Sequence, residues 1–269
     1  TSLGSKEQKQ RYLPACARGE TRATFAWQAA HGAPDSLGLA ARETSHGYEI
    51  SGQVHYVPNG DLADHIVVVA QLDGVPTGFV LSRGCPGFQI QGVDALDPTR
   101  PLATMQFDEV RLSTSARMPG DVTAIERVFD GARIALAAEM VGGAEQCLDM
   151  AVLYAQQRKQ FGRAIGSFQA IKHMCADMLL AVESARSAVY FAAWAFDHDP
   201  EQVPEAAAIA KAYASDAYGQ CAGANIQIHG GIGFTWEHDA HLYFKRAQAS
   251  STLLGDGPWH RARIADWVL

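Results

Sequence analysis

The sequence has few cysteines, no excess of basic residues and no long hydrophobic run. Its five cysteines show no spacing typical of a metal site, so we expect small buried side chains in a reducing compartment and no bound metal. A net charge of −7 argues against a nucleic-acid partner or a basic membrane-binding surface. Without a visible signal peptide or an apolar stretch that could span a bilayer, the chain is expected to be cytoplasmic.

What the chain does have is 48% hydrophobic residues, enough for one large domain or two modest ones. Short segments rich in Val, Ile and aromatic residues fill residues 24–120. Gly, Pro and Asp-Gly pairs separate them, a pattern typical of an antiparallel barrel or sandwich. From residue 121 to residue 269, long Ala-rich stretches with short connections predict a helical bundle. Residues 1–23 hold one short helix, which ends near Gly19.

The stretch 154–169, YAQQRKQFGRAIGSFQ, lies between two apolar helices and carries three cations, Arg158, Lys159 and Arg163. Cations are favoured at a helix C-terminus by the helix dipole. A glycine stop and a Ser-led restart of the next helix should follow. Such a corner can hold an anion in the arginine fork and stack Phe161 on a flat ring. The alternative is an ordinary helix hairpin with solvated charges.

Four segments together resemble the acyl-CoA dehydrogenase family of flavoproteins: KEQKQRYLPACARGE, Gly52-Gln53 with Asn59-Gly60, RKQFG followed by IG and FQ, and QIHGGIGFTWEHDAHLYFKRA. The resemblance implies an α+β acyl-CoA dehydrogenase fold. Residues 24–120 would form an antiparallel β-barrel-like middle domain, and residues 121–269 a C-terminal four-helix bundle. Residues 1–23 would be the remnant of an N-terminal helical domain that is mostly absent.

The resemblance also implies FAD as cofactor, held at its nucleotide end and across a subunit interface. The residues that match the family's FAD-binding motifs are Arg158, Gln160, Phe161, Gln227, Gly230 and Gly231. Glycines there allow backbone N–H groups to approach phosphate oxygens closely. The alternative interpretation of Gly230-Gly231 is a plain helix C-cap without a ligand. His229 is expected to pack rather than to react.

The flavin-ring end departs from the family pattern. Gln28 stands where the family has a threonine that bonds the flavin, and Pro34 where it has a serine. Tyr56 and Pro58 replace the aromatic and the hydroxyl of the family's W-I-T-N run. Proline has no hydroxyl and no N–H to offer the flavin, so ring binding is expected to be weakened.

The catalytic glutamate of the family is missing from both of its usual positions, where this chain has Gly255 and Ala132. Asp256 is the first candidate for a substitute base, although its side chain is one methylene shorter. Glu139 is a second, but a lone carboxylate in an apolar run is expected to pair with a facing helix.

Two residues match the positions that contact the substrate in the family. Asp130 and Arg133 match an F-D-x-x-R run that contacts the CoA moiety in the family, and they could equally form a surface ion pair. His260-Arg261 resembles the ending of actinobacterial members that act in mixed complexes.

Two hypotheses follow. In the first, the chain is the subunit of a heteromeric acyl-CoA dehydrogenase that lacks the glutamate, and a second, glutamate-bearing subunit completes the site. In the second, it is a self-sufficient dehydrogenase with Asp256 as base. In both, the substrate is an acyl-CoA from fatty acid or steroid side-chain breakdown, and an electron-transfer flavoprotein accepts the electrons.

Overall fold

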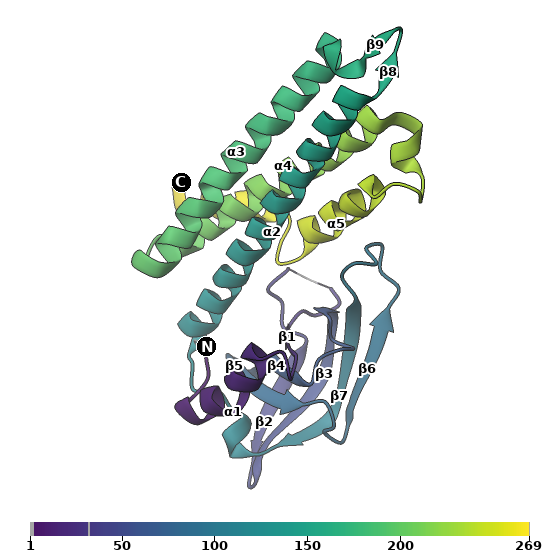
Figure 1. Cartoon of the computed structure of the whole chain (residues 1–269). Coiled ribbons are helices and arrows are strands. Elements are labelled where there is room, and N and C mark those ends of the chain that lie inside the picture. The colour runs from purple at the N-terminus through teal and green to yellow at the C-terminus, as the bar shows by residue number, and fades with distance from the viewer. Residues whose placement is uncertain (1–2, 32, 269) are drawn as a thin grey trace. The chain divides into compact units, whose positions relative to one another are not determined.

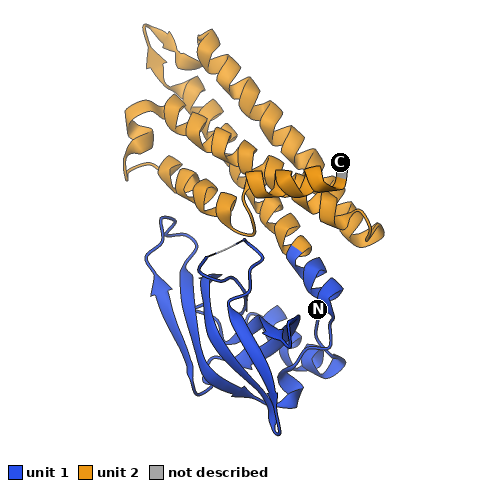
Figure 2. Ribbon diagram, turned by 180° about the vertical axis from the view of Figure 1, so that it is seen from behind, with its two compact units in different colours: residues 1–129 blue, residues 130–269 orange. Residues whose placement is uncertain are grey.

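The computed structural model describes residues 3–31 and 33–268 of the chain. These residues form two compact units, residues 1–129 and 130–269, which are described separately below (Figure 2). Helix α2, Val122–Gln157, begins in the first unit and continues in the second. The boundary expected between residues 120 and 121 lies just before this helix, whereas the division by compactness falls within it.

The first unit combines α1, Lys6–Ala17, with a seven-stranded sheet and the short helix η1, Thr114–Ala116 (Figure 1). Its strands are β1 Ala23–Ala26, β2 Leu39–Thr44, β3 Gly47–Pro58, β4 His65–Leu72, β5 Val75–Ser82, β6 Phe88–Val93 and β7 Leu102–Leu112. Their order is β1-β4-β2-β3-β7-β6, and β5 pairs with β4 outside this path. Asp73 and Gly74, both with positive φ, make the tight turn between β4 and β5.

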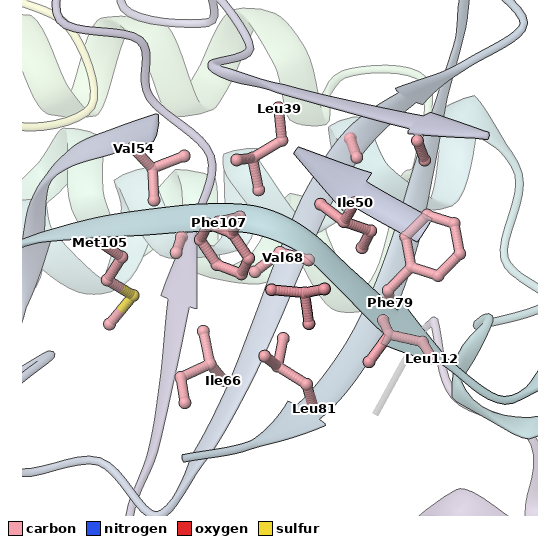
Figure 3. Close-up of a cluster of buried hydrophobic side chains, with 14 of the residues drawn as sticks. Leu39, Ile50, Val54, Ile66, Val68, Phe79, Leu81, Met105, Phe107 and Leu112 are labelled. Carbon is pink, nitrogen blue, oxygen red and sulfur yellow. The ribbon is translucent and has the colours of Figure 1, made fainter. Parts of the chain in front are cut away.

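The core of the first unit lies on one face of the sheet. Alternate residues of β7 are buried and exposed, as expected for a strand with one face turned toward the core. Figure 3 shows side chains of β3, β4, β5 and β7 pointing toward one another. Five fully buried members of this cluster are Ile50, Ile66, Phe79, Met105 and Phe107.

The sheet is mixed, whereas the strand pattern predicts antiparallel pairing throughout. β1 and β2 both pair with β4 in the parallel direction, and the other pairs in the sheet are antiparallel. Alternation of apolar and polar residues is the same in both directions, so it cannot distinguish them. The direction depends on the connections between the strands, which the pattern does not report.

The second unit is helical. It contains most of α2, then α3 Gln169–His198, α4 Val203–His229, α5 Ala240–Thr252 and α6 Gly257–Val268. Short elements connect them: strands β8 Lys159–Gln160 and β9 Arg163–Ala164, and the helices η2 Ile165–Ser167 and η3 Gly230–Phe234. The three long helices and the short ones after them confirm the bundle that the Ala-rich pattern predicts.

Helices α2 and α4 approach closely because one glycine of α2 faces a large ring of α4. Tyr218 is only 2% exposed, and a Cβ added at Gly143 would lie 2.7 Å from its hydroxyl oxygen and still nearer to its ring. The preceding Gly142 differs, since a Cβ there would meet nothing within 4 Å. The first glycine therefore sets the helix spacing and the second does not.

This pair of glycines gives a matched test of the packing. Gly143→Ala should lower the free energy of unfolding by roughly 1–3 kcal/mol, the usual cost of overpacking. Gly142→Ala should leave it unchanged or raise it by up to about 1 kcal/mol, because alanine favours a helix. Urea unfolding of the two variants measures the difference, and equal stability of both would contradict the close approach.

Candidate functional site

The corner after α2 is a tight β-hairpin rather than a direct helix connection. β8 pairs with β9, and the turn between them consists of Phe161, with φ 52°, and Gly162, with φ 77°. Two successive left-handed residues are the backbone of a two-residue hairpin turn. The expected Ser-led restart of the next helix is wrong: the Ser167 hydroxyl donates to Ala164 O, and α3 begins without a side-chain cap.

The hairpin presents its side chains to solvent. Phe161 is 91% exposed, and Arg163 lies over the Phe168 ring at 4.1 Å. The Gln160 amide donates to its neighbour's carbonyl oxygen, Lys159 O. Among residues 3–31 and 33–268, the exposed Arg158 side chain makes no hydrogen bond or ion pair. Its guanidinium group and the Phe161 ring are thus available to a ligand.

The glycine turn after α4 is also open. Gly230 ends the helix with φ 64°, and a Cβ added at Gly230 or Gly231 would meet nothing within 4 Å. Gln227 is exposed one turn earlier. A third glycine, Gly233, was not singled out from the sequence, yet a Cβ there would lie 2.9 Å from Ile226 O and from His229 Cβ. Gly233 therefore keeps the turn compact while the first two glycines leave its outer surface free.

A ring contact brings these two motifs together. Tyr154, on the last turn of α2, stacks on His229 with ring centroids 4.2 Å apart. The His229 ring is buried and its Nδ1 donates to Asn225 O, which confirms that this histidine packs. Burial is the main cause that lowers its pKa. Arg158 and Gly230 each follow one partner of this stack, so both lie at one end of the second unit.

Gly255, at the position that the resemblance predicts for the catalytic glutamate, has no space for a side chain. Leu254 and Gly255 both have positive φ, 62° and 102°. A Cβ at Gly255 would lie 2.5 Å from Trp259 Cε3 and 2.9 Å from His260 Nε2. The backbone conformation and the packing thus exclude a side chain at this position.

Asp256 and Glu139 both have structural partners. Asp256 is exposed, and its Oδ1 accepts from the backbone N–H of Trp259 at 2.8 Å, which caps the first turn of α6. Glu139 pairs with Arg246 of α5 at 2.9 Å, confirming the expected pairing with a facing helix. Neither carboxylate lies in a dry environment, since Asp256 is exposed and the Glu139 side chain is 44% exposed.

Asp130 and Arg133 form an ion pair that is buried, which makes the surface alternative wrong. The Arg133 Nη1 to Asp130 Oδ1 distance is 2.7 Å, and both residues are at most 5% exposed. Arg133 also lies 5.2 Å from the centre of the Trp259 ring and donates to Leu254 O. The pair therefore helps to hold the loop, and its expected contact with CoA stays a prediction.

Two buried basic residues hold the same loop, and neither role was predicted. Lys211 is fully buried in α4, and its Nζ donates to Ser215 Oγ, Ser251 O and Gly255 O at 3.0–3.1 Å. His260 is also fully buried and donates from Nε2 to Leu254 O. A lone lysine in an Ala-rich helix was the only signal in the sequence for the first of these contacts.

The His260 ring is held neutral. Burial, followed by the positive charges of Arg133, Lys211 and Arg263, lowers its pKa to about 3. Because Nε2 carries the proton that Leu254 O accepts, Nδ1 is the unprotonated nitrogen, and it has no partner among the described residues. A proton added there would create a fourth cation in this cluster.

In the first unit, the segment expected near a flavin ring is irregular. β3 shifts register between Val54 and Val57, and Tyr56 within this bulge has φ 56° and is 45% exposed. Pro58 offers only its carbonyl oxygen, which accepts from the Thr24 hydroxyl at 2.7 Å. A non-glycine residue in left-handed conformation is uncommon and marks a strained site.

The described ranges 3–31 and 33–268 contain no helix long and apolar enough to cross a membrane. Within the same residues, no group of three or more His, Cys, Asp or Glu side chains could hold a metal ion.

Comparisons with known proteins bear on the family and the fold of this chain. Residues 103–269 match the family model described as "Acyl-CoA dehydrogenase, C-terminal domain". "Acyl-CoA dehydrogenase IpdE2" of Mycobacterium tuberculosis is 42% identical over 245 residues, covering 90% of this chain and 69% of that protein. The protein of the same name from Mycolicibacterium smegmatis is 40% identical, and the chain spans 57% of its length.

A solved structure shares the fold. The structure of the "ChsE4-ChsE5 complex from Mycobacterium tuberculosis" has a TM-score of 0.91 and 26% identity, covering 99% of this chain and 71% of that chain. This chain belongs to the acyl-CoA dehydrogenase family, a class of FAD-dependent oxidoreductases. The α+β fold expected from the resemblance is thereby confirmed.

The burial of His260 predicts how stability depends on pH. The folded pKa lies below the unfolded value of about 6.5, so the unfolded chain binds the extra proton. Stability from this residue is present above about pH 6.5 and falls by about 1.4 kcal/mol per pH unit as the pH drops toward 3. Replacing the histidine with His260→Gln should reduce that slope.

Urea unfolding followed by far-UV circular dichroism between about pH 7 and pH 4 checks this dependence. His46→Gln, at an exposed position, is the matched control and should keep the wild-type slope. Identical pH slopes for His260→Gln and the wild type would show that the buried ring is not responsible.

Proposed function

We propose that this chain is the subunit of an FAD-dependent acyl-CoA dehydrogenase that holds the nucleotide end of FAD, while a second family member supplies the base. The reaction of the complex is the α,β-dehydrogenation of an acyl-CoA thioester, with an electron-transfer flavoprotein as electron acceptor. The observation that carries this proposal is the loop at Gly255, the position that the resemblance assigns to the glutamate. A side chain there would overlap Trp259 and His260.

The FAD-binding end of the chain supports the first part of the proposal. Arg158 is exposed and has no protein partner among the described residues, so it can donate to a phosphate as a charge-assisted fork. Gly230 and Gly231 leave the backbone accessible, and the exposed Phe161 offers an apolar ring. Bound FAD supplies the acceptor for the β-hydride of the substrate. Gln160 and Gln227 are assigned to the same end of the cofactor.

A protein partner is supported by the exposed face of α3. Five large apolar side chains on this helix are 46–69% exposed: Leu179, Leu180, Tyr190, Phe191 and Trp194. At about 100° per residue they fall within an arc of roughly 120°, so they share one side of the helix. Large exposed apolar and aromatic side chains that share one side of a helix are typical of a protein interface. A solved structure of the same fold is named as a complex of two proteins, ChsE4 and ChsE5.

The alternative is a self-sufficient dehydrogenase in which Asp256 removes the α-proton. A general base needs a desolvated carboxylate so that its pKa approaches neutrality. Asp256 is exposed, and one of its oxygens already caps α6 through the Trp259 N–H. The geometry therefore favours the partner hypothesis.

Expression of the chain alone and together with a glutamate-bearing family member separates the two hypotheses. The single chain should not bleach flavin absorbance with any acyl-CoA tested, whereas the co-purified complex should. Asp256→Asn should leave the activity of the complex unchanged, and should also keep the helix cap, because the Asn amide oxygen can still accept from the Trp259 N–H. Gly255→Glu should not create activity in the single chain, because the new side chain has no space.

Two outcomes would overturn the proposal. One is a single chain that binds stoichiometric FAD and bleaches it with a CoA thioester, when the Asp256→Asn variant no longer shows this bleaching. The other is failure of the chain to associate with any glutamate-bearing homologue encoded near its own gene.

Arg158 provides a separate test of the cofactor contact. Arg158→Ala should weaken FAD retention in the complex by roughly 1.5–3 kcal/mol, the usual value of a hydrogen bond to a charged group. Lys172→Ala, which removes an exposed cation from the first turn of α3, is the matched control. The flavin content of gel-filtered complex measures both, and equal retention in the two variants would argue against this placement.

A further inference from the structure

A second candidate site lies in the first unit, between α1 and the sheet. Gln8 fixes one end of α1, because its buried amide donates to Ser115 O and Arg117 O at 2.9 and 3.0 Å. Tyr12 fixes the helix one turn later by an edge contact with His65, with ring centroids 4.8 Å apart. Beside these two attachments lies a cleft of about 560 Å³, bounded by α1, β5, the end of β7 and η1.

Three arginines from three different parts of the chain line this cleft: Arg11 of α1, Arg111 of β7 and Arg117 after η1. Among the described residues, none of the three has a carboxylate oxygen nearer than the 3.9 Å from Arg111 Nε to Glu49 Oε2. The lining holds a single carboxylate, that of Glu7, which is exposed to solvent. The cleft is therefore cationic in a chain whose net charge is −7.

The other lining groups indicate what kind of anion would fit. Ser113 and Ser115, whose hydroxyl oxygens are 2.9 Å apart, stand beside the arginines and can donate to further oxygens. Val80, Leu81 and the Tyr12 ring form an apolar wall. Arginine forks and hydroxyl groups suit a phosphate with several acceptor oxygens, and an apolar wall suits a non-polar body attached to it. The volume lies in the range of small-molecule sites.

We infer that the cleft between α1 and the sheet binds a small molecule that carries a phosphate group on an apolar or aromatic body, such as a nucleotide. This site is separate from the proposed FAD contacts of the second unit. It does not depend on the proposed subunit role. The phosphate could belong to a free nucleotide or to the nucleotide part of a larger coenzyme, and the shared chemistry is the phosphate monoester.

Isothermal titration of the whole chain with AMP tests the inference, with adenosine and inorganic phosphate as the two partial ligands. AMP should bind saturably and more weakly as salt is added, and adenosine should not bind measurably. Arg11→Gln and Arg111→Gln should each reduce the affinity at least about tenfold, a usual effect of losing one charge-assisted contact. Coenzyme A and dephospho-coenzyme A, titrated in parallel, show which phosphate a larger ligand would use.

Arg18→Gln is the matched control, because Arg18 is an exposed arginine at the end of α1 that does not line the cleft. This variant should bind AMP as the wild type does, and so should Arg158→Ala, which changes only the proposed FAD contact. Absence of saturable AMP binding would overturn the inference. So would an equal loss in the control variant, or loss in Arg158→Ala with no loss in the two cleft variants.

Discussion

The C-terminal part of the second unit depends on one buried ammonium group. A fully buried charge costs several kcal/mol unless hydrogen bonds compensate for the lost water. Lys211 meets this requirement with three oxygen acceptors, one on its own helix and two carbonyls from the end of α5 and the following loop. Because those carbonyls turn inward to reach it, the loop takes the left-handed conformation seen at Leu254 and Gly255. His260 and Arg133 donate to the neighbouring carbonyl and hold it in place.

The conformation of this loop leaves no space for a catalytic carboxylate at position 255. Trp259 and His260 occupy the volume next to Gly255, where catalytically complete relatives are expected to have their glutamate. Placing a carboxylate at position 255 would require a different loop conformation and other hydrogen-bond acceptors for Lys211, and a single substitution supplies neither. The proposed FAD contacts are independent of this loop, since Arg158 follows α2 and Gly230 follows α4. A chain can therefore carry the proposed FAD contacts without a base at Gly255, and the stack of Tyr154 on His229 holds the elements that bear those contacts together.

Several features could be predicted because they depend on neighbours in the sequence. The long helices follow from Ala-rich periodic stretches. A break in the helical pattern near Gly162 was expected too, but not the β-hairpin whose turn Phe161 and Gly162 form. The pairing of Glu139 with Arg246 was also expected, because an ionised side chain in an apolar run needs a partner. Strand direction in the sheet was not predictable, since alternation is the same for parallel and antiparallel pairs. The hydroxyl of Ser167 was misassigned because a serine near a helix start has several local acceptors to choose from.

By itself the sequence indicated the family and the order of a sheet-forming part before a helical part, and the resemblance predicted that no carboxylate stands at either usual position of the base. It could not show what takes the place of that carboxylate. Lys211 and Gly255, like Arg133 and Leu254, are far apart in the chain, and only folding places them within hydrogen-bonding distance. The same holds for the exposure of Asp256, which reads as a candidate base in the sequence and serves as a helix cap in the folded chain. Burial and long-range contacts, which decide pKa values and available space, belong to the packed structure and leave little trace in any short stretch of residues.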